Sequence, residues 1–329
     1  MRPPVGTFRS LRVSQGRRPF LGLRADRLTA ESRGVGTLRA DHARRIDEAA
    51  AAFALGYDSG LTASGPPGWA AVERAAVGDG AGFVVEGAAM AATVRDLLRP
   101  GRGMAATTAL WESTGRRHPH TFHCGVGWGF AVLGRRPRAR WAALDPLLRW
   151  LAYDGLGFCH AFIGGPAAGR VKVPQHWSAA ERAVAFQGIG RAQWFLTSPR
   201  GVGDRIRAYP AHVHQDLWAG VGLAAGYAGG DPRDLAALVD DAGAAAADLA
   251  VGAVCAAAAR HHGEVWTDTA DAALDVLARL GHRAAIELHD ACLADLDPVA
   301  EPEAYLTWRA RVRSGVVDAA ASRTNGARA

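Results

Sequence analysis

The sequence predicts a mainly α-helical fold, a single bundle-like domain, on three observations. Nearly half of the 329 residues are hydrophobic (49%), so the chain can bury a substantial core. Every segment with clear periodicity repeats apolar residues at helical spacing, and alanine is abundant. No alternation of strand and helix patterns indicates a βαβ unit. We therefore expect helices packed on helices, preceded by an arginine-rich N-terminal arm.

Composition divides the chain into three expected regions. Residues 1–40 carry Gly, Pro, Ser and Arg with weak periodicity and are predicted to form a basic arm. Residues 41–300 are predicted to form the helical domain, and residues 301–329 a terminal helix with a disordered tail. Residues 1–45 contain eleven arginines against three acidic residues, a net charge of +8 in a chain of net charge +6. A solvated arm is the simpler interpretation, and docking on an acidic partner or a membrane is the alternative.

In the first half of the helical domain, breaker and capping residues separate four expected helices. Asp41 is predicted to cap a helix that reaches about Tyr57 and is broken at 65–68 by Gly-Pro-Pro-Gly. A short helix at 69–77 and a longer one at 84–98 follow. Residues 116–134 alternate like a strand, but their repeated glycines favour a buried helix pressed against a neighbour.

In the second half, proline and capping residues mark the helix starts. Asp145-Pro146 is predicted to start a helix that reaches Asp154 and ends at 155–157, Gly-Leu-Gly. Ser178 and Glu181 have the spacing of a capping box. The other expected helices lie at 204–209, 214–228, 232–243, 244–260, 267–280, 283–295 and from Tyr305 onward.

Two Gly-Val-Gly segments, at 125–127 and 220–222, hint at an internal repeat. The alternative is a chance resemblance between glycine-rich packing helices. The glycines around 188–190 and 220–226 do not have dinucleotide-binding spacing, and no strand precedes them. The chain also has neither a P-loop nor a nucleophile elbow. NAD-dependent dehydrogenases, P-loop ATPases and standard α/β-hydrolases are therefore excluded, and we expect no cofactor.

The location signals favour the cytoplasm. Arg17-Arg18 resembles a twin-arginine export signal, but charged residues follow where an apolar segment is required. No apolar run approaches the ~18 residues of a transmembrane helix. The four cysteines are scattered, as expected for free thiols in a reducing compartment. The nearly neutral body gives no support for nucleic-acid binding.

His118, His120 and His123 form the densest group of metal-ligand side chains. Three imidazoles within six residues predict a metal-dependent oxygenase if the segment turns back on itself. Histidines with ordinary hydrogen-bond partners are the alternative.

Several polar residues are embedded in otherwise apolar helices. A buried charge is costly unless it is paired, so we expect Asp154 or Asp216 to pair with Arg191. One interpretation is a structural ion pair that locks the bundle. The other is a pocket in which an acid and a base transfer protons. The candidate catalytic residues are Glu86, Asp154, His160, Gln187, Arg191 and Asp216.

Aromatic residues near these positions are candidates for the pocket wall. They would suit a flat, polyunsaturated substrate, and they would equally suit an ordinary core. The candidate substrate-binding residues are Trp128, Trp150, Tyr153, Trp194 and Trp218.

Six stretches, in order over about Ile46 to Arg260, resemble the domain-of-unknown-function family 1702, the enediyne biosynthesis protein family. The sequence departs from the family pattern at two positions. Phe186 stands where the family has an acid. Cys159 precedes His160, so no family role is carried over to that histidine. The matching stretches are FVVEGAAMAATVRDLLRP (83–100), HCGVGWGFAVLGRRP (123–137), LDPLLRWLAYDGLGF (144–158), FQGIGRAQWF (186–195), DLWAGVGLAAGYAGG (216–230) and the alanine-rich helix that follows.

The resemblance implies a cytoplasmic accessory protein of enediyne-type polyketide biosynthesis, with no nucleophile or cofactor carried over. We expect an enzyme that acts on a polyene or enediyne-core intermediate, with Asp154 and Asp216 as acid and base and Arg191 as their partner. The alternative is a non-catalytic scaffold or carrier that shelters the polyene or docks a polyketide synthase or other pathway enzymes.

Overall fold

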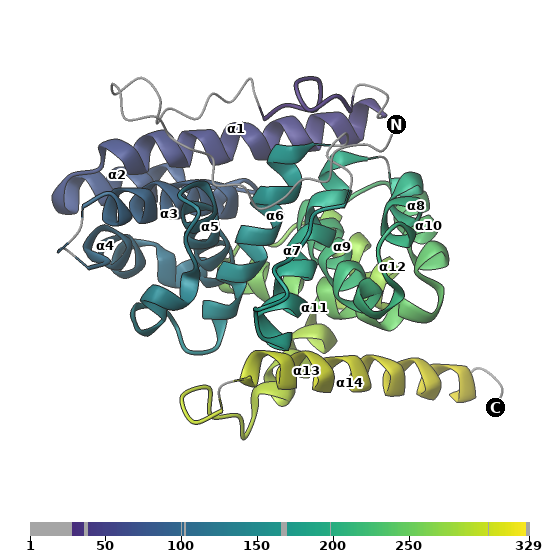
Figure 1. Ribbon diagram of the computed structural model, residues 1–329. Coiled ribbons are helices and arrows are strands. Elements are labelled where there is room, and N and C mark those ends of the chain that lie inside the picture. Colours follow the sequence, from purple (N-terminus) through teal and green to yellow (C-terminus); the bar gives the residue numbers. More distant parts are fainter. Residues whose placement is uncertain are drawn as a thin grey trace.

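The computed structural model describes residues 28–35, 39–99, 101, 103–165, 170–197, 199–301 and 303–326, and within these ranges every regular element is a helix (Figure 1). The predicted mainly α-helical fold is therefore confirmed. Most of the predicted basic arm lies outside the described residues.

Seven of the described helices pack side by side in chain order. Each contacts mainly the helix before it and the helix after it. The last of the row, α11, also touches α5, so the row curves back toward its own first half (Figure 1). The row consists of α1 (Ala40–Thr62), α3 (Ala81–Leu97), α5 (Pro119–Val132), α6 (Leu151–Gly164), α7 (Ala179–Leu196), α9 (His214–Ala228) and α11 (Ala246–His262).

Glycine pairs of the form Gly-x-Gly let the inner helices of this row approach both neighbours. Two residues on, a helix has turned about 200°, so the two glycines point to opposite sides. A Cβ on Gly188 would lie 1.8 Å from the carbonyl oxygen of Asp154 on α6. A Cβ on Gly190 would lie 1.9 Å from the carbonyl oxygen of Leu217 on α9. Only glycine permits backbones this close.

The glycine pairs recur along the row and extend the repeat suggested by the two Gly-Val-Gly segments. In each pair the first glycine faces the preceding helix and the second faces the following one. The structural unit is one helix with its two close contacts, repeated at intervals of 30, 33 and 32 residues. The pairs are Gly125 and Gly127, Gly155 and Gly157, Gly188 and Gly190, and Gly220 and Gly222.

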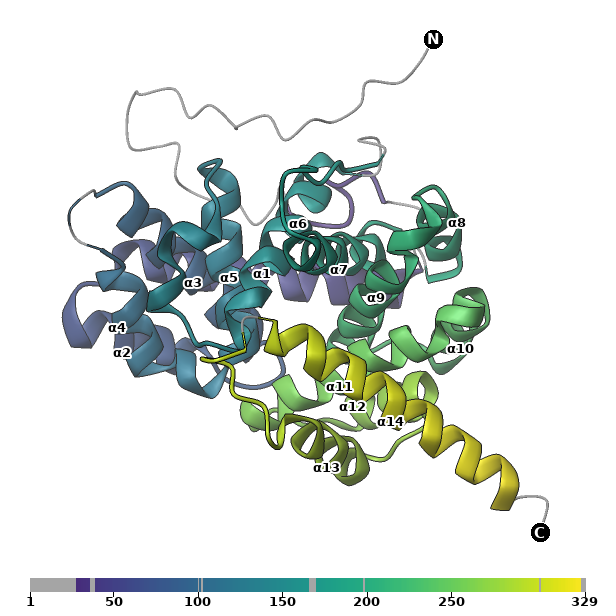
Figure 2. The ribbon, with the colours of Figure 1, turned by 60° about the horizontal axis from the view of Figure 1, so that its bottom comes forward.

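The C-terminal helix α14 (Ala304–Gly326) packs on α11 and α13 (Figure 2). Arg309 pairs with Asp216 at 3.0 Å, and Arg313, one turn later, pairs with Asp248 at 3.0 Å. Both acids stand in the first turn of their helices, where a carboxylate is favoured. The predicted terminal helix is thus present and packs against the rest of the domain.

The remaining helices cover the flanks of the row. They are α2 (Gly65–Ala75), α4 (Ala105–Ser113), α8 (Val202–Arg207), α10 (Pro232–Ala242), α12 (Asp268–Ala278) and α13 (His282–Leu293).

Some predicted helix ends were wrong. The helix expected from Asp145 begins at Leu151, after a 3₁₀ turn, and continues through the glycines at 155–157 to Gly164. Those glycines face the carbonyl oxygens of neighbouring helices, so tertiary packing outweighs their low helix propensity. The Gly-Pro-Pro-Gly at 65–68 does end α1, but it also forms the first turn of α2.

Capping residues predicted helix starts better than glycine and proline predicted helix ends, although one predicted cap is wrong. Ser178 and Glu181 form the predicted capping box, and Asp231 caps α10. The predicted cap Asp41 is wrong, because it lies inside the first turn of α1, and Asp204 likewise lies inside the first turn of α8. Helix α4 was not predicted.

One helical stretch of the described chain, Pro232–His262, is long and apolar enough to cross a membrane. The interior of the domain buries 72% of its most apolar window, as it would in the core helix of a soluble protein. Length and composition are therefore weak evidence for a membrane span here.

Candidate functional site

A buried cluster of three charged side chains lies where α3, α6 and α7 meet. Arg191 of α7 places Nε 2.8 Å from Asp154 Oδ1. Its Nη1 and Nη2 donate to Glu86 Oε1 at 3.3 and 3.2 Å. The exposed fractions of Arg191, Glu86 and Asp154 are 7%, 3% and 0%. The prediction that Asp154 pairs with Arg191 is confirmed, and Glu86 is a second partner.

The repeat explains why these side chains meet. Cys124, Asp154 and Gln187 each directly precede the first glycine of a pair, and Glu86 precedes Gly87, which faces α1. Equivalent positions on successive helices of a curved row face the same interior. The positions one turn later carry Trp128, Phe158 and Arg191.

Polar neighbours fix the carboxylates. Gln187 Nε2 donates to Asp154 Oδ2 at 2.9 Å, and its side chain also hydrogen-bonds the Tyr305 hydroxyl of α14 at 3.1 Å. The Trp128 indole N–H donates to Glu86 Oε1 at 3.2 Å. The guanidinium of Arg191 lies 4.4 Å from the centre of the Phe158 ring. The cluster is thus held by contacts from several helices, as a preorganised site requires.

Two carboxylates share one cation, so the cluster is not neutral when both are ionised. Burial raises the pKa of Glu86, Arg191 opposes that rise, and Asp154 adds to it. Burial acts to lower the pKa of Arg191, but Asp154 and Glu86 outweigh it and raise that pKa. Glu86 Oε1 accepts three N–H donors, while Oε2 accepts none from the described residues. Glu86 Oε2 is therefore the atom best placed to hold a proton.

Two narrow cavities flank this pair, and both are lined by Phe83, Glu86, Arg191 and Phe195. We call them the tyrosine cavity and the tryptophan cavity. The tyrosine cavity has a volume of about 30 Å³ and is also lined by His120, Thr121, Cys124, Leu151, Leu223, Ala224, Tyr227, Cys255 and Ala259. The tryptophan cavity has a volume of about 40 Å³ and is also lined by Leu28, Ile46, Ala49, Ala50, Phe53, Trp128, Phe158 and Phe162.

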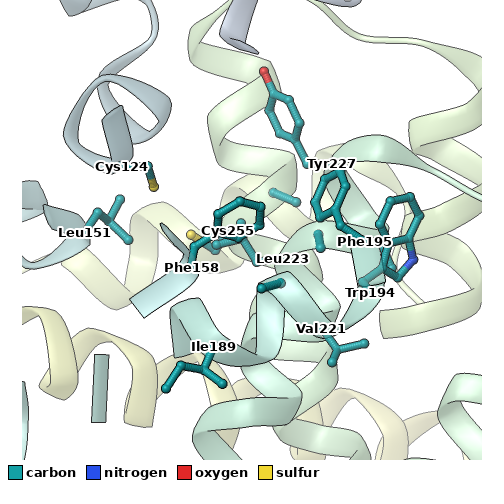
Figure 3. Packing of buried hydrophobic residues seen from close by; sticks show 14 of the residues in the cluster. Cys124, Leu151, Phe158, Ile189, Trp194, Phe195, Val221, Leu223, Tyr227 and Cys255 are labelled. Carbon is teal, nitrogen blue, oxygen red and sulfur yellow. The ribbon is translucent and has the colours of Figure 1, made fainter. Parts of the chain in front are cut away.

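These volumes hold a few water molecules, so an elongated ligand requires side chains to move. Phe83 and Phe195 line both cavities, so we expect these two side chains to be the ones that move. Figure 3 shows Phe158 and Phe195 in this interior with the thiols of Cys124 and Cys255. Burial raises the pKa of both thiols, which are therefore neutral and poor nucleophiles.

Two predicted catalytic residues lie outside this cluster. Asp216 pairs with Arg309 and not with Arg191, so it is a structural contact of α14. His160 lies on α6 but is not among the residues that line either cavity. Burial lowers its pKa to about 4, which keeps it neutral.

Of the five predicted aromatic wall residues, Trp128 alone lines one of the two cavities. Tyr153 donates its hydroxyl to Glu181 at 2.5 Å, and its ring lies 6.3 Å from Trp150. Trp194 packs against His42, with 4.4 Å between ring centres, and Trp218 is buried in the core. These four are core residues.

Sequence reasoning missed the residues that complete the site. The position of Cys124 before a glycine pair is the signal that would have placed it beside Asp154. The phenylalanines carry no such signal. The missed residues are Phe83, Cys124, Phe195, Tyr227 and Tyr305.

The three histidines proposed as metal ligands do not form a site. His123 uses both ring nitrogens, because Nδ1 donates to the Pro119 carbonyl at 2.7 Å and Nε2 accepts the Asp145 N–H at 3.2 Å. Across the described part of the chain, no three His, Cys, Asp or Glu side chains are placed to hold a metal ion. The hypothesis of an oxygenase with His118, His120 and His123 as ligands is therefore not supported.

Folding stability should report the ionisation of Glu86. Because its folded pKa lies above the unfolded value of 4.5, the stability that Glu86 contributes is fully present below pH 4.5 and is lost as the pH rises through the folded pKa. Glu86→Gln should remove this fall, whereas Glu287→Gln, at an exposed residue, should not. Chemical denaturation across this pH range measures the effect. Identical pH dependences for wild type and Glu86→Gln would contradict it.

The model of the family described as "Protein of unknown function (DUF1702)" matches residues 12–316. No curated protein and no solved structure matches the chain.

Proposed function

This chain belongs to the DUF1702 family, and we propose that it moves a proton on a conjugated polyketide intermediate at Glu86. The intermediate would be a polyene or enediyne-core precursor, which the resemblance to enediyne biosynthesis proteins supports. The protein would be a cytoplasmic accessory enzyme that works without a nucleotide cofactor, alongside a polyketide synthase or other pathway enzymes.

The observation that carries this proposal is that the buried carboxyl group of Glu86 lines both cavities. Its unbonded Oε2 belongs to a carboxyl group that lines two apolar cavities, and these share aromatic walls suited to a conjugated chain. Burial raises its pKa, which suits a carboxyl group that both gives and takes a proton. The buried ion pair alone would fit a structural lock. A carboxyl group that lines both cavities and has one oxygen without a donor in the described chain favours chemistry.

The reaction class that fits is a shift of double bonds. Glu86 Oε2 would take a proton from an sp³ carbon beside the conjugated segment and return it to another carbon of the chain. Atoms and electrons balance without an oxidant or reductant. Arg191 would stabilise the Glu86 carboxylate while it lacks the proton, and Asp154 with Gln187 would hold Arg191 in place.

Glu86→Gln should abolish conversion, since the amide cannot carry the proton. We expect a loss of at least about 10²-fold, typical of a missing acid–base group. Asp216→Asn is the matched control and should keep wild-type conversion once its folding is verified. The measurement is mass spectrometry and ultraviolet absorption of the polyene fraction of an enediyne-producing strain, before and after incubation with each protein.

A carrier that only shelters the polyene is the other candidate, and the same assay separates it. Wild-type protein that binds the polyene and never changes its spectrum would contradict the enzymatic proposal. Conversion at an undiminished rate by Glu86→Gln would contradict the role of Glu86.

A further inference from the structure

Two residues that line the tyrosine cavity each have a buried polar atom without a partner in the described chain. The Tyr227 hydroxyl and His120 Nδ1 make no hydrogen bond to any part of the chain that the structure describes. Both residues line the cavity and are only 6% and 5% exposed. An unsatisfied buried polar group costs about 1–3 kcal/mol, so such groups are uncommon unless something else satisfies them. A polar atom of a ligand would do so.

The two cavities differ in polarity, and the difference gives a ligand its direction. Both cavities share Glu86 and Arg191. The other side chains that line the tryptophan cavity are apolar, except for the indole N–H of Trp128, which donates its hydrogen bond to Glu86. The tyrosine cavity adds the hydroxyl of Tyr227 and the imidazole of His120. A ligand with one polar end and an apolar body therefore fits in one orientation.

The charges nearby select a neutral polar end. Arg191, the cation of the cluster, is already shared by Glu86 and Asp154. Arg260, whose guanidinium lies 4.6 Å from the centre of the Tyr227 ring, is already paired with Asp79. A carboxylate ligand would add a third negative charge to this buried region, at a large desolvation cost. Burial lowers the pKa of His120 well below its usual value, so the ring is neutral and offers no positive charge to an anion.

We propose that the tyrosine cavity binds the carbonyl oxygen at the end of a conjugated chain whose apolar body occupies the tryptophan cavity. The Tyr227 hydroxyl donates to that oxygen, and His120 donates in the tautomer that carries the proton on Nδ1. This assignment rests on the proposed function and names its substrate class, an enone or longer polyenone.

The carbonyl also completes the proton-transfer chemistry. When Glu86 Oε2 takes a proton from the chain, the electron pair of that C–H bond delocalises through the double bonds onto the carbonyl oxygen. The resulting enolate oxygen is stabilised by the donors in the tyrosine cavity. Return of the proton to another carbon restores the carbonyl and leaves the double bonds shifted, with no net change of composition.

The test compares four ligands of one chain length: a linear conjugated dienone, the dienol, the dienoate and the diene hydrocarbon. Their dissociation constants are measured by quenching of tryptophan fluorescence. We expect wild-type protein to bind the dienone most tightly. Tyr227→Phe should weaken dienone binding about tenfold and leave hydrocarbon binding unchanged. Tyr57→Phe, at a buried tyrosine outside both cavities, is the matched control and should change neither.

Folding is not a confounding factor for the variant. The Tyr227 hydroxyl has no partner in the described chain, so Tyr227→Phe should unfold at the same denaturant concentration as wild type or a higher one. Tighter binding of dienoate, dienol or hydrocarbon than of dienone would overturn the assignment. So would equal dienone binding by wild type and Tyr227→Phe. Conversion of polyene that depends on Glu86 would still stand in those cases, so the two proposals fail separately.

Discussion

Replacing Arg191 by methionine is expected to lower the free energy of unfolding by about 3–5 kcal/mol, because the change leaves two carboxylates buried without a cation. Glu86 and Asp154 both pair with this guanidinium, and neither has another cationic partner among the described residues. The loss should be largest at neutral pH and smaller in acid, where protonation removes the unpaired charges. Denaturant unfolding followed by circular dichroism measures it.

A rescue variant separates this charge effect from lost packing. Glu86→Gln and Asp154→Asn, added to Arg191→Met, remove all three charges and should recover most of the stability. Arg283→Met, at an arginine whose side chain is 92% exposed, should leave unfolding unchanged. If Arg191→Met unfolded at the wild-type denaturant concentration, the cluster would not be the buried ion network described above.

Gly188→Ala is expected to destabilise the protein by about 3 kcal/mol or more, the upper range for overpacking. In an open helix the same change would stabilise by about 1 kcal/mol, so the sign alone is informative. Here the new Cβ would lie 1.8 Å from the carbonyl oxygen of Asp154, and backbone cannot yield as a flexible side chain does. The helices α6 and α7 would have to separate, and Gln187 would move away from Asp154.

Gly281→Ala is the matched control, because a Cβ there meets nothing within 4 Å. This glycine precedes α13, and its replacement should change stability by less than about 1 kcal/mol. Thermal and denaturant unfolding of both variants give the comparison. Equal stability of Gly188→Ala and wild type would contradict the close packing of the row.

Helices could be predicted from the sequence more easily than their ends. Apolar periodicity and capping residues located most of the helices, including the buried glycine-rich one at 119–132. Local propensity predicts a helix end at Gly155 and Gly157, because it cannot show that a neighbouring backbone lies against them. Whether a glycine ends a helix or lets the helix pack closely depends on a partner helix about thirty residues away in the sequence.

The candidate site could be predicted only in part for the same reason. The cost of a buried charge correctly indicated a partner for Arg191, and Asp154 is one. The same cost does not show whether Asp154 or Asp216 is the partner. Asp216 pairs instead with Arg309, which lies 93 residues away in the sequence. Glu86 was a candidate, but its contact with Arg191 spans 105 residues. An alignment of the helices on their glycine pairs would have placed Cys124, Asp154 and Gln187 at equivalent positions that face the same interior.

Solvent deuterium exchange tests the role of Glu86 most directly. The pathway polyene or a conjugated dienone is incubated with the protein in deuterated water, and carbon-bound deuterium is measured by mass spectrometry. Wild-type protein should shift the double bonds, followed by ultraviolet absorption, and either carry the migrating hydrogen to its new carbon or replace it with deuterium. Glu86→Gln should do neither, while Asp216→Asn should behave like wild type. A double-bond shift or deuterium exchange by Glu86→Gln at the wild-type rate, or neither of them by wild-type protein, would contradict proton transfer at Glu86.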